Sequence, residues 1–276
     1  MSVVKSLPAA SIPVPSDAPP ASGPVAVFDS GLGGLTVLRA LQRRLPGEDF
    51  FYFADTHHLP YGDKPEAFLR ERGRKVAVAL AERGCKALVV ACNTATAAAA
   101  EVIRESVEIP VVALEPGVKP AAAATRRGVI GVLATTRTLA SERFSRLVRE
   151  HAAHVQVIAR ACPGLADAIE VHGPDSREVA ALLDDFVSSL AEADQVVLGC
   201  THYPWVREAI AARLPGAELI DTGEAVARQL ERILRGNGRL GGHGRLAVAT
   251  SGNPVAVRET VARLWGSPLP VEHWNI

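Results

Sequence analysis

Two cysteines stand in matching sequence settings and have the chemistry of a proton-transfer pair. Residues 87–94 read ALVVACNT and residues 194–201 read DQVVLGCT, so Cys92 and Cys200 each follow a short apolar run and precede polar residues and a helical pattern. The field at a helix N-terminus favours a thiolate, so we expect both thiols to have a pKa below the usual value of about 8.5. General acids and bases work best with a pKa near the working pH. The pattern therefore predicts two thiols tuned for proton transfer.

One thiol from each of two similar segments suits the inversion of a carbon stereocentre. Such an inversion removes a proton from one face of the carbon and delivers a proton to the opposite face. One thiol must begin as thiolate and the other as protonated thiol, with the roles exchanged in the reverse direction. A different reaction class stays open, a hydrolase or transferase with Cys200 as nucleophile and His202 as base, but it leaves Cys92 unexplained. A non-catalytic amino-acid-binding regulator is a third hypothesis, and the presence of both thiols counts against it.

Charged groups beside the two thiols are candidate assistants. Asp29 and Ser30 begin a glycine-rich loop that does not match GxGxxG, and an acidic residue at its start suits an ammonium group better than a pyrophosphate. His202 is placed to assist Cys200, as Asp29 is placed to assist Cys92. We therefore count Asp29 and His202 with the two cysteines as candidate catalytic residues.

Small polar groups near these residues are candidates for binding a substrate. Amide, hydroxyl and backbone donors at helix starts suit a carboxylate, and a loop with a flexible glycine can close over a ligand. The residues that offer these groups are Asn93, Thr94, Thr201, Tyr61 and Gly62.

The segments that must position these residues have the pattern of an α/β fold. From residue 24 onward, short apolar runs alternate with helical patterns, which indicates a parallel sheet covered by helices. Most runs are continuously apolar, so we expect strands buried on both faces. Amphipathic segments predict helices over 65–83, 177–191 and 223–235. The predicted strands are 25–29, 50–54, 86–91, 111–113, 129–134, 154–159, 195–199, 218–220 and 245–250.

The two cysteine segments indicate a weak internal duplication. We predict two pseudo-symmetric α/β domains, one of residues 24–116 plus 222–276 and one of residues 117–221. Ligands of open α/β sheets bind beyond the carboxyl ends of the strands, where the polar clusters of this sequence stand. The active site is therefore expected in the cleft between the domains. Residues 1–23, rich in Pro, Ala and Ser, are expected to form a disordered tail.

Composition excludes several function classes. Lys+Arg and Asp+Glu both number 30, so we expect neither a nucleic-acid partner nor an anionic membrane surface. No apolar stretch approaches the roughly 20 residues that span a bilayer. The N-terminus lacks the features of a secretory signal, so we expect a cytoplasmic protein with reduced cysteines, of which Cys85 and Cys162 serve packing. No CxxC or HxxxH spacing is present, and no metal site is expected.

Taken together, the motifs resemble those of the glutamate racemases, within the aspartate/glutamate racemase family. The resemblance extends from residue 24 to the C-terminus. It implies flavodoxin-like domains and cofactor-independent interconversion of L- and D-glutamate in a homodimer. It also implies that D-glutamate supplies peptidoglycan, and with it the cell wall and cell shape. The motifs, in order, are FDSGLGGLTVL, FADTHHLPYGDK, VVACNTATA, ALEPGVKPA, IGVLATTRT, GCTHYPWVREAI and IDTGEAVA.

The resemblance also carries roles for individual residues. It implies that Cys92 and Cys200 are the catalytic bases. Glu170, in CPGLADAIE, aligns with a glutamate often placed near the second thiol. Racemisation of aspartate stays open as an alternative, but an aspartate racemase more often has a glutamate soon after its second cysteine, where this chain has Thr201 and His202. The implied substrate contacts are Asp29, Ser30, Tyr61, Gly62, Asn93, Thr94, Thr201 and His202.

Overall fold

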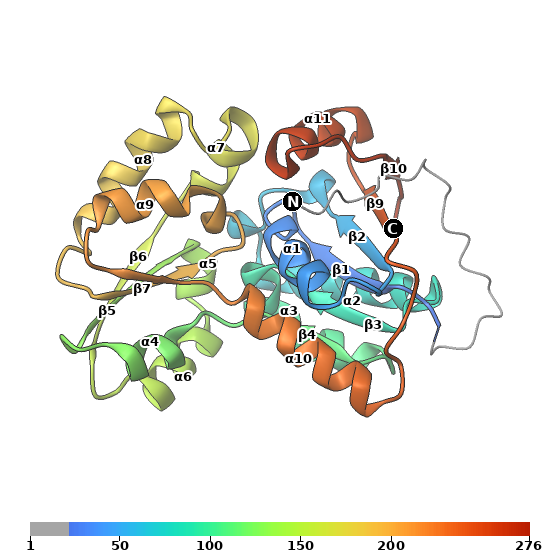
Figure 1. Ribbon diagram of the computed structural model, residues 1–276, viewed down its shortest axis with the longest axis horizontal. Coiled ribbons are helices and arrows are strands. Elements are labelled where there is room, and N and C mark those ends of the chain that lie inside the picture. The colour runs from blue at the N-terminus through green and yellow to red at the C-terminus, as the bar shows by residue number, and fades with distance from the viewer. Residues whose placement is uncertain (1–21) are drawn as a thin grey trace.

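The computed structural model describes residues 22–276, which form two parallel sheets side by side, each covered by helices (Figure 1). The first sheet has the strand order β10-β9-β2-β1-β3-β4, and the second has the order β6-β5-β7-β8. The strands of the first sheet are β1 (Val25–Asp29), β2 (Phe50–Ala54), β3 (Ala87–Val90), β4 (Val111–Ala113), β9 (Leu246–Thr250) and β10 (Val271–His273). Those of the second are β5 (Val129–Ala134), β6 (Gln156–Ala161), β7 (Gln195–Gly199) and β8 (Glu218–Ile220).

The two sheets share one four-stranded unit. The order β2-β1-β3-β4 of the first sheet recurs as β6-β5-β7-β8 in the second, so β1 corresponds to β5 and β3 to β7. All these strand pairs are parallel. Sheets of this order bind ligands at the switch point, between β1 and β3 or between β5 and β7. The predicted α/β fold with two pseudo-symmetric halves is confirmed.

Helices cover both faces of the sheets, which explains why the strands are continuously apolar. Alternate residues of β1 face different helices: Val25 and Val27 pack with α1 and α10, whereas Ala26 and Phe28 pack with α2 and α3. The helices are α1 (Leu35–Arg44), α2 (Glu66–Glu82), α3 (Asn93–Ser106), α4 (Val118–Ala124), α5 (Thr136–Leu139), α6 (Glu142–His151), α7 (Leu165–His172), α8 (Arg177–Ser188), α9 (Arg207–Arg213), α10 (Gly223–Gly236) and α11 (Pro254–Trp265). Three-residue or four-residue 3₁₀ turns occur at Thr56–His58, Tyr61–Asp63 and Tyr203–Val206.

The structure departs from the predicted elements in a few places. Strand β6 begins at Gln156, two residues after the predicted start, because a turn occupies 152–155. Strand β10 was not predicted, because its three residues do not form an apolar run: Val271 is followed by Glu272 and His273. Of the predicted tail, residues 1–23, the first 21 lie outside the described residues. Within residues 22–276, no helix has the length and apolar character needed to cross a membrane.

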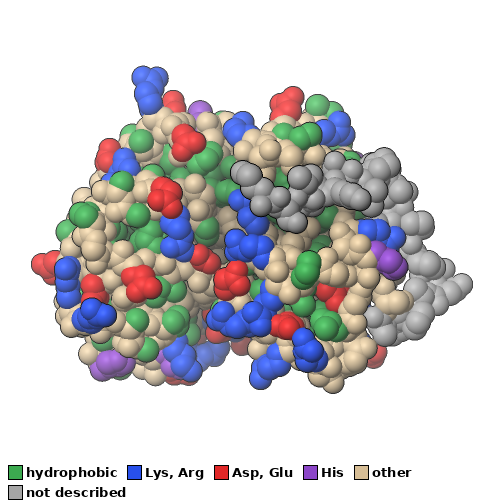
Figure 2. All heavy atoms as spheres, in the orientation of Figure 1, with side chains coloured by type: hydrophobic (Ala, Val, Ile, Leu, Met, Phe, Trp, Pro, Cys, Tyr) green, Lys and Arg blue, Asp and Glu red, His purple; other side chains and the backbone are tan. Residues whose placement is uncertain are grey.

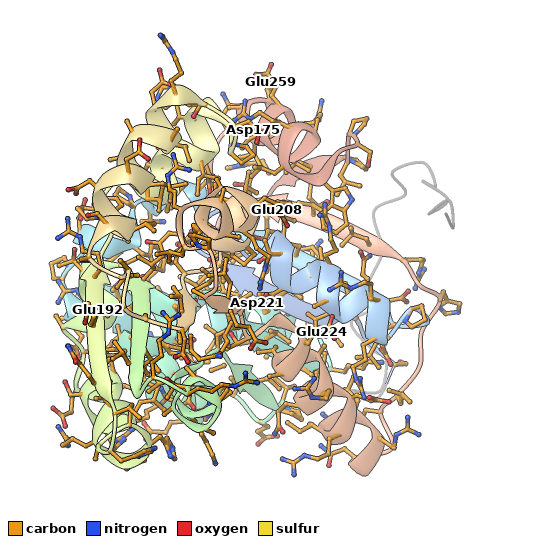
Figure 3. The ribbon with its side chains drawn as sticks, turned by 60° about the vertical axis from the view of Figure 1, so that its left-hand side comes forward. Asp175, Glu192, Glu208, Asp221, Glu224 and Glu259 are labelled. Carbon is orange, nitrogen blue, oxygen red and sulfur yellow. The ribbon has the colours of Figure 1, made fainter. Side chains whose placement is uncertain are left out.

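The connection between the two halves carries ion pairs on an exposed face. The chain returns from the second half between β8 and α10, where Arg207 pairs with Asp221 and Arg43 pairs with Glu224 at 2.8 Å. Figure 2 shows charged side chains of both signs over the seam, and Figure 3 shows Asp221 and Glu224 at the start of α10. Exposed pairs of this kind contribute only about 0–1 kcal/mol each. Each of these pairs lies within one predicted domain, so other residues make the contacts that join the halves.

Candidate active site

A cavity lies between the two halves, at the carboxyl ends of strands from both sheets. It is bounded by the segments after β1, β3, β5, β6 and β7 and by the loop after β2. The polar clusters predicted to converge on one cleft do converge. The predicted site residues that line the cavity are Ser30, Tyr61, Gly62, Cys92, Asn93, Thr94, Glu170, Cys200, Thr201 and His202.

Cys92 is the N-cap of α3, and its sulfur accepts a hydrogen bond from the Ala95 N–H at 3.4 Å. The first turn, 93–96, contains a single alanine, and the run of alanines with high helix propensity follows it at 97–100. The expected lowering of the thiol pKa is nevertheless wrong for Cys92. Burial raises the pKa of Cys92 strongly and the charge of Asp29 raises it further, against weaker opposing contacts from Ser30 and Ala95. Desolvation therefore outweighs the helix N-terminus, and Cys92 is held as the protonated thiol.

Asp29 lies one layer behind the cavity wall and is fully buried. Its two carboxylate oxygens accept hydrogen bonds from the backbone N–H groups of Ser30 at 2.8 Å and Gly34 at 2.6 Å. The carboxylate thus closes the glycine-rich loop and does not line the cavity as predicted for a substrate contact. The Ser30 Oγ lies 3.4 Å from an Asp29 oxygen and 3.4 Å from the Cys92 sulfur. Asp29 therefore reaches Cys92 through Ser30.

Cys200 lies beside a histidine, which in turn contacts a glutamate. The Cys200 sulfur lies 3.6 Å from His202 Nδ1, and His202 Nε2 lies 2.6 Å from Glu170 Oε1. Burial by itself lowers the pKa of His202, but the contacts with Cys200 and Glu170 overcome it and raise the pKa well above the usual value. His202 is therefore an imidazolium, which donates from both nitrogens, toward the sulfur and toward the carboxylate.

The segment after Cys200 differs from the predicted helix start. The backbone N–H groups of Tyr203 and Trp205 bond to carbonyls three residues back, which forms a 3₁₀ turn, and α9 begins only at Arg207. The two thiols are therefore alike in strand position but not in the helix that follows. This difference leaves His202 as the main polar neighbour of Cys200.

Glu170 contacts the first half of the molecule in addition to His202. Its Oε1 accepts a hydrogen bond from the Leu32 N–H of the first half at 2.7 Å. A Cβ at Gly31 would collide with Glu170, and one at Gly33 would collide with His202. The loop therefore needs glycine at both positions for the close approach of the halves. The sequence motif pointed to Glu170, but its partner Leu32 is a backbone donor without any signal in the sequence.

Thr135 is a cavity residue that the sequence analysis did not single out. Its hydroxyl lies 3.0 Å from the Thr94 hydroxyl of the other half and also caps α5 by accepting from the Thr138 N–H at 3.2 Å. Its place in the polar cluster after β5 was the available signal. Further lining residues are Leu59, Pro60, Asp63, Thr136, Cys162, Pro163, Gly164, Ala166 and Asp167.

The two remaining cysteines are buried free thiols. Burial raises the pKa of Cys85 to about 12 and that of Cys162 to about 12. Both pack in apolar clusters as expected, although Cys162 also reaches the cavity wall. Within residues 22–276, no group of three or more His, Cys, Asp or Glu side chains is arranged to hold a metal ion.

Comparison with known proteins places the chain among racemases. The family model described as Asp/Glu/hydantoin racemase matches residues 39–230. The glutamate racemase of Pseudomonas aeruginosa strain PAO1 is 49% identical over 257 residues, which cover 90% of this chain and 96% of that protein. This chain belongs to the Asp/Glu racemase family. It is thus an amino-acid racemase.

Solved structures of glutamate racemases share the fold of this racemase. One from Bacillus anthracis has a TM-score of 0.84 at 31% identity, with coverage of 92% of this chain and 98% of that one. The Thermus thermophilus enzyme in complex with β-chloro-D-alanine has a TM-score of 0.79 at 36% identity, covering 93% and 98%. The Francisella tularensis enzyme in complex with D-glutamate has a TM-score of 0.80 at 27% identity, covering 93% and 98%.

Proposed function

We propose that this racemase interconverts L- and D-glutamate by proton transfer at Cα, with Cys92 and Cys200 as the two bases and no cofactor. The observation that carries the proposal is that both thiols line one cavity from equivalent strand ends of the two halves. They are close enough for the charge of Cys200 to raise the pKa of Cys92. The glutamate racemase relatives and the D-glutamate bound to the Francisella tularensis enzyme support glutamate as the substrate.

The surroundings of the thiols supply the asymmetry that a two-base reaction needs. Cys92 starts protonated, because burial and Asp29 raise its pKa. The His202 imidazolium stabilises negative charge on the Cys200 sulfur. In one direction Cys200 removes the Cα proton while Cys92 delivers its proton to the opposite face. In the reverse direction the roles of the two thiols exchange. Ser30, which contacts both Asp29 and Cys92, connects the carboxylate to the thiol.

The remaining candidate residues hold the substrate. The Tyr61 hydroxyl donates to Asp55 at 2.6 Å, so this side chain is already engaged within the first half. The loop residues Tyr61 and Gly62 therefore contact the substrate through their backbone N–H groups. The start of α3 at Asn93 adds donors suited to a carboxylate. The residues proposed to bind glutamate are Ser30, Tyr61, Gly62, Asn93, Thr94, Thr201 and His202, with Glu170 orienting His202.

The wider role of the enzyme follows from the family resemblance. We place it in the cytoplasm as a homodimer that supplies D-glutamate for peptidoglycan. For its domains we keep the division into residues 24–116 plus 222–276 and residues 117–221.

Proton NMR in heavy water tests the reaction. Purified enzyme without added cofactor should exchange the Cα proton of L-glutamate and of D-glutamate while optical rotation decays from both. Cys92→Ser and Cys200→Ser should each abolish racemisation, and each should retain Cα exchange of one enantiomer at most. Cys85→Ser, a buried thiol outside the cavity, is the matched control and should racemise normally.

Three outcomes would contradict parts of the proposal. Near-normal racemisation by Cys92→Ser or Cys200→Ser would exclude the two-base reaction. Exchange of aspartate without exchange of glutamate would replace the proposed substrate. A covalent substrate adduct on Cys200, detected by mass spectrometry, would favour nucleophilic catalysis.

A further inference from the structure

Tyr52 is a fully buried residue of β2 whose hydroxyl lies against the glycine-rich loop. The hydroxyl donates to the Gly31 carbonyl at 2.9 Å and lies 3.4 Å from Oδ2 of Asp29. Tyr52 does not line the cavity, and the proposed reaction does not use it. Its hydroxyl is therefore a buried polar group directed at the carboxylate that connects through Ser30 to Cys92.

We propose that Tyr52 is a positioning residue that fixes the Asp29 carboxylate and, through Ser30, the proton on the Cys92 thiol. The inference rests on the proposed role of Cys92. The loop is built for this contact, since a Cβ at Gly34 would lie 2.9 Å from the Asp29 Cβ and 3.0 Å from the Tyr52 hydroxyl. Such contacts are too close for a side chain, so glycine at this position keeps the carboxylate and the phenol together.

The hydroxyl of Tyr52 has one hydrogen, and both the Gly31 carbonyl and the Asp29 carboxylate lie within its reach as acceptors. Toward Asp29 it is a donor, and a donor favours the ionised carboxylate over the protonated acid. Burial raises the pKa of Tyr52 well above its usual value, so the group stays a neutral hydroxyl. The site thus keeps a hydrogen-bond partner for Asp29 without adding another charge.

Several ionisable groups besides Tyr52 act on Asp29. Burial raises the pKa of Asp29, His202 and the Gly34 N–H lower it, Glu170 raises it, and the nearby Cys92 thiol lowers it. The hydroxyl of Tyr52, as a donor, adds to the groups that stabilise the ionised form. Removing it leaves a buried carboxylate with one donor fewer, so the pKa of Asp29 should rise by on the order of one unit.

Tyr52→Phe tests the proposal by two measurements. The first follows the Asp29 carboxyl carbon by NMR as a function of pH in protein with ¹³C-labelled aspartate, assigned with Asp29→Asn. The second measures kcat/KM against pH in both directions. The matched control is Tyr203→Phe, which removes the hydroxyl of an equally buried tyrosine on the Cys200 side.

We expect Tyr52→Phe to raise the titration midpoint of Asp29 and the acidic limb of kcat/KM by on the order of one pH unit, with no shift of the midpoint in Tyr203→Phe. An unchanged Asp29 titration in Tyr52→Phe would overturn the proposal. The NMR titration needs no turnover, so it decides this point even if the wild-type enzyme fails to racemise glutamate. If Tyr52→Phe does not fold, 3-fluorotyrosine at this position, a stronger donor of the same shape, should lower the midpoint. A midpoint that stays or rises would contradict the inference.

Discussion

Replacing Glu170 by glutamine removes the negative charge of the side chain and keeps its shape. The amide keeps an oxygen that can accept from the Leu32 N–H, now 2.7 Å from Glu170 Oε1, so the contact between the halves survives. The negative charge beside His202 Nε2, at 2.6 Å, is lost. Because Glu170 helps to raise the pKa of His202, Glu170→Gln should lower this pKa while the loop stays in place.

The expected size follows from the contact that is lost. A hydrogen bond to a charged group contributes about 1.5–3 kcal/mol, and 1.36 kcal/mol corresponds to roughly one pKa unit. The pKa of His202 should therefore fall by about 1–2 units. At a pH above the old value, the fraction of imidazolium beside Cys200, and with it kcat, should be roughly 10- to 100-fold lower than in the wild type, and the difference should shrink to nothing below the new value.

The sign of the pH dependence distinguishes this effect from a general defect. His202 has a folded-state pKa raised above its unfolded value, so its stabilisation is full below the unfolded pKa and is lost as pH rises through the folded pKa. In Glu170→Gln, the loss begins at lower pH. The basic limb of kcat should move down by about 1–2 units, and the stability deficit should be largest at acidic pH and vanish at alkaline pH.

Racemisation rates and thermal midpoints across pH, with NMR titration of the His202 imidazole, measure these effects. The matched control is Glu192→Gln in the second half. Glu192 is exposed at the amino end of β7, whereas Cys200 follows its carboxyl end, and Figure 3 labels it at the edge of the molecule. A Glu170→Gln enzyme whose basic limb coincides with that of wild type would refute the reasoning, as would an equal shift in Glu192→Gln.

Two further predictions concern other contacts. Thr135→Val removes the hydroxyl that lies 3.0 Å from the Thr94 hydroxyl and should raise the KM for glutamate about 3- to 10-fold. Thr135→Ser keeps a hydroxyl, so its KM should stay within about twofold of the wild-type value. Equal KM values for the two variants would contradict the role of the hydroxyl. Burial by itself raises the pKa of Asp49, but hydrogen bonds from Arg245 and His243 overcome it and lower the pKa well below the usual value. The stabilisation by Asp49 is thus present above its unfolded pKa and is lost as pH falls through the folded pKa. Asp49→Asn should therefore lower the free energy of unfolding in urea by about 1–2 kcal/mol at neutral pH, and this deficit should shrink below about pH 4. A deficit that stays constant with pH would speak against the prediction.

Local pattern was enough to predict most of the fold. The strands are continuous apolar runs because helices cover both sheet faces, so β1, β5 and β7 could be located to the residue. The cysteines at the ends of β3 and β7 follow from the same local register. Parallel strands bring their carboxyl ends to one edge of each sheet, so each thiol could be placed at the ligand-binding edge of its own half. That the two edges face each other was expected from the two-domain hypothesis and not from the strands themselves.

What depends on the relative position of the two halves could not be read from the sequence. The contact of Glu170 with Leu32 joins residues 138 positions apart through a backbone N–H that has no sequence signal. The pKa of Cys92 was predicted in the wrong direction, because the sequence shows the helix start but not the depth of burial. The sequence by itself determined which groups stand at the strand ends. Packing between the halves decided which of these groups are in contact and which charged groups are desolvated, because contact and desolvation both depend on the tertiary arrangement of the two halves.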